Sequence, residues 1–175
     1  MANVHNPRGF HPIRGSGGGE PRMRRYKANV TTDIFQGDIV QLLAAGTVKS
    51  ITTTTGNDKI LGVAANRVIK AASTTSQDVW VYDDPVQEFE VTDDGLAATP
   101  SQASVGAGCA LIIATGNTTT GMSKMELDAS AEGQAASKPV LIEGFKTGPS
   151  FEIGKYATEI VKLNRHIWKL GSSGV

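Results

Sequence analysis

The sequence predicts an all-β fold, an antiparallel β-barrel or sandwich that carries an extended N-terminal arm. Short runs of β-branched and aromatic residues recur about every 8–15 residues and are separated by turn-forming residues. The chain contains 20 Gly and 7 Pro, which suits short strands joined by many turns. Its length of 175 residues is that of one ordinary domain.

The first 27 residues differ in composition from the rest, so we divide the chain into an arm, residues 1–27, and a body, residues 28–175. The arm holds six basic residues against the single carboxylate of Glu20, a formal charge of +5, so the neutral chain carries −5 in its body. Its GSGGG run and three prolines disfavour a regular helix or a central strand. Such charge asymmetry indicates a partner of opposite sign.

The first half of the body is predicted to hold five strands. They cover residues 39–43, 47–52, 59–64, 78–82 and 86–92. The first two are separated by the turn Ala45-Gly46, which predicts a hairpin. The run 59–64 is apolar at alternate and intervening positions alike, which predicts a central strand buried on both faces.

The second half is predicted to add four strands and one helical turn. The strands cover residues 105–115, 124–128, 139–145 and 156–164. Residues 129–136 are rich in alanine and form the one segment for which a short helix is expected.

Acidic residues are concentrated in one part of the body, because no basic residue lies between Lys70 and Lys124. The carboxylates there are Asp78, Asp83, Asp84, Glu88, Glu90, Asp93 and Asp94. Strand alternation places Glu88 and Glu90 on one face, about 7 Å apart, with Phe89 on the other. Three interpretations stay open for the residues from Asp83 onward: a solvated face, a docking face for a basic segment, or a metal or catalytic site.

Apolar and aromatic side chains are interleaved with the basic residues of the arm. They are Val4, Phe10, Ile13, Met23 and Tyr26. A solvated linker needs no such side chains, so we expect the arm to be disordered when free and ordered against another protein surface. The acidic face of a neighbouring subunit is one such surface. Charge would steer this contact and apolar burial would hold it, because an exposed ion pair contributes only ~0–1 kcal/mol.

Signatures of enzymes and metal sites are absent from the sequence, which contains no GxSxG, HExxH, GxxxxGK[ST] or CxxC motif. Cys109 is the single cysteine, which excludes an internal disulfide, and its apolar neighbours predict a buried, inert thiol. The three histidines, His5, His11 and His166, are not spaced as metal ligands. We therefore expect no catalytic residue, no metal and no cofactor.

The sequence also predicts neither membrane nor nucleic-acid contact. No segment approaches the ~18–20 apolar residues of a membrane helix, and the first residues lack the apolar region of a signal peptide. The basic residues of the body are scattered, so they offer no stripe for a phosphate backbone. We expect synthesis in a cytoplasm.

Four segments carry a resemblance to a known family. They are MANVHNPRGFHPIRG at 1–15, ILGVA at 60–64, AST followed by VWVYDDP within 72–85, and GMSKMELD at 121–128. In this order, over nearly the whole chain, they resemble small structural proteins of tailed bacteriophages. The sequence is most similar to the capsid decoration, or cement, proteins of short-tailed phages, including phages of cyanobacteria.

The resemblance implies a non-enzymatic virion protein that sits as a homotrimer on the capsid surface, where it binds the major capsid protein and stabilises contacts between capsomers. It implies that the arm is the capsid-binding segment. The residues expected to make this contact are Arg8, Phe10, Ile13, Arg14, Arg22, Arg24, Arg25 and Tyr26. Removing residues 2–25 should then leave the body folded but unable to bind expanded capsids.

Three alternatives remain beside the decoration role. The first is another virion module, either the base of a head fibre or a tail-associated protein. The second is a nucleic-acid-binding module that uses Arg22, Arg24, Arg25 and Tyr26 as a basic and aromatic clamp. The third is an enzyme with Glu88, Glu90 or Cys109 at its centre.

Overall fold

The structure, a computed structural model, describes residues 3–15, 18–29, 31–52, 59–70, 77–96, 99–133 and 138–169, and this part of the chain is all-β. Its strands are β1 (His11–Arg14), β2 (Met23–Ala28), β3 (Ile39–Leu42), β4 (Thr47–Ser50), β5 (Ile60–Ala64), β6 (Asp78–Tyr82), β7 (Glu88–Thr92), β8 (Gly108–Ile112), β9 (Glu126–Gly133), β10 (Val140–Phe145) and β11 (Thr158–Leu163). The described residues include no helix long and apolar enough to cross a membrane. The predicted fold class is confirmed.

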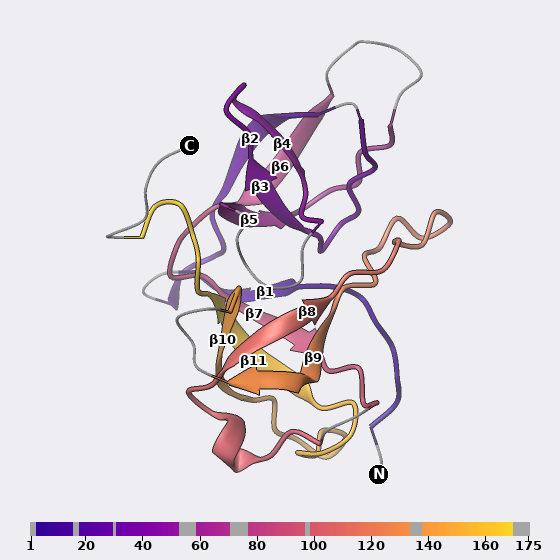
Figure 1. Ribbon diagram of the computed structural model, residues 1–175, viewed down its shortest axis with the longest axis vertical. Coiled ribbons are helices and arrows are strands. Elements are labelled where there is room, and N and C mark those ends of the chain that lie inside the picture. Colours follow the sequence, from indigo (N-terminus) through magenta and orange to yellow (C-terminus); the bar gives the residue numbers. More distant parts are fainter. Residues whose placement is uncertain are drawn as a thin grey trace.

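The strands form two lobes, a closed barrel and a six-stranded sheet (Figure 1). The barrel runs β2-β4-β3-β5-β6, and the sheet runs β1-β7-β11-β10-β8-β9. All pairings between these named strands are antiparallel except that of β2 with β4, which is parallel. The predicted hairpin is confirmed as β3 and β4, whose turn contains Gly46 at φ 74°.

The two lobes share one wall, because β3 and β5 contribute to two hydrophobic cores. Ile60 and Val63 of β5 pack in the core of the sheet, whereas Leu61 packs in the core of the barrel. Ile39 and Val40 of β3 divide between the cores in the same way. This arrangement explains why the run 59–64 is apolar at nearly every position: each side of β5 faces a core, as the sequence predicted.

The expected extended arm is not confirmed, because residues 3–14 lie along the chain's own sheet. We call this segment the N-terminal strap. Phe10 is 1% exposed and meets Phe89 edge-on at a centroid distance of 6.4 Å. Residues 11–14 form β1, which pairs with β7 at the edge of the sheet and contains Pro12, a residue tolerated in an edge strand. Residues 23–27, also assigned to the arm, belong to β2 of the barrel.

The helical turn expected over 129–136 is wrong for its first five residues, which belong to β9 and pair with β8. The remaining three, 134–136, lie outside the described residues. Ala129 is buried in this strand, so a long-range pairing partner outweighs the small intrinsic helix preference of alanine.

Gly62 in β5 is required by the close approach of β6. A Cβ atom at this position would overlap the backbone carbonyl group of Tyr82. We therefore expect Gly62→Ala to lower the free energy of unfolding by about 2 kcal/mol, because the β5–β6 pair must separate. Gly133→Ala is the matched control, since no atom lies within 4 Å of its added methyl group. Urea unfolding of both variants measures the difference, and equal stabilities would contradict it.

Candidate functional site

The N-terminal strap is fastened to the body at several points. The Asn3 amide donates to the carbonyl oxygens of Glu152 (2.7 Å) and Lys155 (3.1 Å), and its own oxygen accepts from the Glu152 N–H (3.2 Å). His5 Nε2 lies 2.7 Å from Glu126 Oε1, and its ring stacks on Tyr156 at 4.9 Å. These contacts position the strap across the sheet rather than in solvent.

The basic residues of β2 meet carboxylates of the same chain. Asp83 is 3% exposed, accepts a hydrogen bond of 2.6 Å from the Tyr26 hydroxyl, and lies 3.4 Å from Arg24 Nε. Burial, followed by the Asp83 hydrogen bond, raises the pKa of Tyr26 to about 12. Tyr26 is thus part of an internal network, which argues against its use as a stacking platform for a nucleic-acid base.

The outer face of β2 and β6 carries an exposed group that we call the barrel patch: Met23, Arg25 and Trp80. Met23 and Trp80 are each 46% exposed, and Arg25 is the direct cross-strand partner of Trp80. Asp78 orients this edge, since it pairs with Arg25 (3.5 Å) and Lys27 (2.6 Å). An exposed indole beside a guanidinium is typical of protein-binding surfaces.

The predicted acidic face does not exist as one surface. Glu88 and Glu90 project from the outer side of β7, where Lys162 lies 3.7 Å from the first and Lys146 lies 2.6 Å from the second. The side chain of Asp84 caps the following turn by accepting from the Val86 N–H (3.0 Å). The sequence could not show these partners, because both lysines follow the acidic stretch by more than 50 residues.

Asp93 and Asp94 are buried, and their carboxylates accept hydrogen bonds from backbone N–H groups. Asp93 is 0% exposed and accepts from the N–H groups of Gly95 and Ala157, both at 2.6 Å. Burial raises the pKa of Asp93, although these hydrogen bonds oppose the shift. Asp94 accepts from the Leu96 N–H at 3.4 Å. The Asp-Asp-Gly motif is therefore a turn, and no described cluster of three or more His, Cys, Asp or Glu residues is arranged to hold a metal ion.

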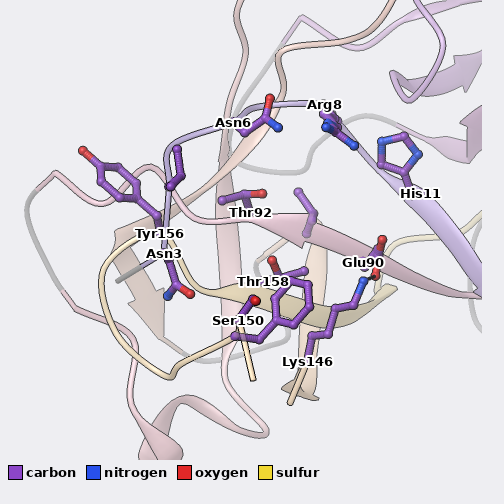
Figure 2. A pocket seen from close by; sticks show the side chains of 14 residues that line it. Asn3, Asn6, Arg8, His11, Glu90, Thr92, Lys146, Ser150, Tyr156 and Thr158 are labelled. Atoms are coloured by element: carbon purple, nitrogen blue, oxygen red, sulfur yellow. Dashed lines mark hydrogen bonds and ion pairs between the residues drawn. The ribbon is translucent and has the colours of Figure 1, made fainter. Parts of the chain in front are cut away.

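A cavity of about 380 Å³, which we call the strap cavity, lies beneath the N-terminal strap (Figure 2). Its roof is the strap, its floor is formed by β7 and β11, and its far wall comes from the loop after β10. Figure 2 shows Glu90 and Lys146 pointing toward one another at one side of it. The sequence did not predict this cavity, since it exists only once the strap has docked.

Glu159 is a buried carboxyl that was not singled out from the sequence. It is 1% exposed in β11, and neither carboxyl oxygen has a hydrogen-bond partner. Burial, then the charges of Asp93 and Glu132, raise the pKa of Glu159 to about 8. Its position in an alternating strand between Ala157 and Val161, both buried, was the available signal.

No hydrogen bond joins Cys109 to His166, so the two side chains are not arranged as a nucleophile and its base. Cys109 is buried, its thiol donates to the Asp128 carbonyl at 3.2 Å, and burial raises its pKa. The expected buried thiol is confirmed. His166 is 0% exposed, its Nδ1 accepts from the Trp168 N–H at 3.1 Å, and burial lowers its pKa to about 4. A thiol held protonated is a poor nucleophile.

The fold and these surfaces define an all-β protein with an intramolecular strap, an exposed aromatic and basic patch, and a polar cavity beneath the strap. The chain matches no protein-family model, no curated protein and no solved structure.

Proposed function

We propose that the chain is a structural protein of a bacteriophage virion, which decorates the outside of the capsid as a homotrimer. The resemblance of four sequence segments to phage cement proteins supports this role. The observation that carries it furthest is the barrel patch, because Trp and Arg are the residue types that dominate binding energy at protein interfaces.

In this proposal the major capsid protein covers the barrel patch. The basic residues first assigned to capsid binding remain exposed, namely Arg8, Arg14, Arg22, Arg24 and Arg25. Phe10, Ile13 and Tyr26 are instead engaged in the chain's own fold, as buried or half-buried side chains. A trimer presents three copies of the patch at once, so modest individual contacts add to a strong attachment. The role requires neither catalysis nor a cofactor.

Trp80→Ala is expected to weaken binding to undecorated, expanded capsids by about 30-fold or more, because a central interface Trp commonly contributes 2 kcal/mol or more. Co-sedimentation of purified protein with such capsids measures the effect. Ile153→Ala is the matched control, since Ile153 is 44% exposed and lies outside the patch.

Equal capsid binding by Trp80→Ala and the unchanged protein would reject the patch as the docking surface. Electron microscopy of the particle separates this proposal from its nearest alternative. Density for the chain on the capsid exterior supports the decoration role, whereas density at a fibre base or tail supports the other virion module.

A further inference from the structure

The strap cavity has the size of a small-molecule site. Its volume of about 380 Å³ falls within the range of ligand pockets in proteins. The strap that forms the roof is fixed at both ends, because Phe10 is buried in the core and Asn3 is hydrogen-bonded to Glu152 and Lys155. The walls are therefore held in place before any ligand arrives, which lowers the entropic cost of binding.

The charges that line the strap cavity favour an anion. Arg8 and Lys146 are opposed by Glu90 alone, and the Lys146 ammonium already neutralises that carboxylate at 2.6 Å. His11 also lines the cavity, and burial lowers its pKa, so its ring is neutral near pH 7. The net formal charge of these side chains is thus +1. Asn6 can orient the guanidinium: with its amide turned so that the oxygen faces Arg8, that oxygen accepts from Arg8 Nε (3.1 Å) and Nη2 (2.9 Å).

The remaining lining groups fit a hydroxylated ring better than a bare ion. Thr92, Ser150 and Thr158 present hydroxyl groups, each of which both donates and accepts hydrogen bonds. Val4 and Phe151 supply apolar surface, and Lys146 lies over the Phe151 ring at 4.6 Å. A sugar ring offers hydroxyl groups at its rim and C–H groups on its faces, and so matches both kinds of surface.

One wall of the cavity has an unusual backbone conformation. Tyr156 has φ 59°, and it is the only described residue other than glycine with a positive φ. Its ring packs against Gly95, where an added Cβ would overlap it, stacks on His5, and has the Lys155 ammonium 5.2 Å from its centroid. Such conformations cost about 1–3 kcal/mol and are concentrated at ligand-binding and active sites.

We propose that the strap cavity binds a monosaccharide-sized, polyhydroxylated ligand that carries one carboxylate or phosphate group. Arg8, oriented by Asn6, contacts the oxyanion at the rim. The hydroxyl groups of β7 and β11 contact the sugar hydroxyls on the floor. This inference is independent of the virion role, because it concerns the isolated chain.

Two-dimensional amide NMR of the full chain tests the proposal, with glucuronate, glucose 6-phosphate, glucose and inorganic phosphate as separate probes. We expect saturable shifts at Thr92, Ser150 and Thr158 for one or both acidic sugars, with a dissociation constant on the order of 1 mM. Glucose and inorganic phosphate should each bind at least tenfold more weakly. The acidic sugar that binds identifies the carboxylate or the phosphate as the preferred group.

Arg8→Ala should weaken binding of the acidic sugar at least tenfold, whereas Arg14→Ala should leave it unchanged. Both arginines are exposed on the same strap, but only Arg8 lines the cavity. Equal losses in the two variants would show general charge attraction and overturn the proposal. So would inorganic phosphate binding as tightly as the sugars, or an absence of shifts at cavity residues up to about 50 mM of every probe.

Discussion

Glu159→Gln is expected to stabilise the protein increasingly as the pH rises from 5 to 9. The Glu159 carboxyl is buried without a hydrogen-bond partner, and burial raises its pKa in the folded state to about 8, from an ordinary value of 4.5. The folded state therefore holds a proton that the unfolded chain releases. The contribution of this carboxyl to stability is fully present below pH 4.5 and is lost as the pH rises toward 8, by roughly 3–5 kcal/mol in all.

The glutamine amide cannot ionise, so the variant does not lose this stability as the pH rises. Its melting temperature should lie near that of the unchanged protein at pH 5 and about 10 °C above it at pH 9. Differential scanning calorimetry across this range measures the difference. Glu20→Gln serves as the control, because Glu20 is exposed and should show no such trend. A difference for Glu159→Gln that is the same at every pH would contradict the assignment of a buried, protonated carboxyl.

Phe10→Ala is expected to lower the free energy of unfolding by about 3–5 kcal/mol, the usual cost of truncating a buried phenylalanine. The side chain is 1% exposed, packs against Phe89, and belongs to the core of the six-stranded sheet. Its loss leaves a cavity beneath β1. For the same reason, removal of residues 2–25 should now disrupt the body, in contrast to the expectation for a free arm.

Urea unfolding followed by tryptophan fluorescence measures the effect of Phe10→Ala. Val4→Ala is the matched control, since Val4 lies on the same strap but is 79% exposed, and it should change stability by less than about 0.5 kcal/mol. If both variants unfold like the original chain, the strap does not contribute to the core and the arm is free in solution.

The charge asymmetry of the sequence has an intramolecular component. The basic residues of the arm and the carboxylates that follow Lys70 were expected to meet across two molecules. Within one chain, Arg24 reaches Asp83 and Lys27 reaches Asp78. The complementarity was evident from the sequence, but the partner was not. Segments far apart in sequence carry no sign of whether they meet in the same molecule or in another.

The candidate sites were predictable to different degrees. Trp80 lies in a strand whose alternation places Val79 and Val81 inside the barrel, so its exposure could have been inferred from the pattern. The strap cavity could not have been inferred, because its lining comes from the strap, β7, β11 and the loop after β10. The burial of Glu159 was only partly predictable, since alternation places it on the face of Ala157 and Val161 but does not say what covers that face.

The sequence by itself determined the all-β class, nearly every strand and the two-sided burial of β5, because these follow from local alternation, turn residues and apolar runs. The tertiary structure alone decided that the N-terminal segment is a strap and that β9 continues through Ala129. It also decided that the carboxylates of the acidic stretch separate, some buried and others paired with lysines on the outer side of β7. These outcomes depend on pairings between residues distant in sequence. Glycine- and proline-rich composition shows that a segment cannot form a core alone, but not that Phe10 will complete the core of its own sheet.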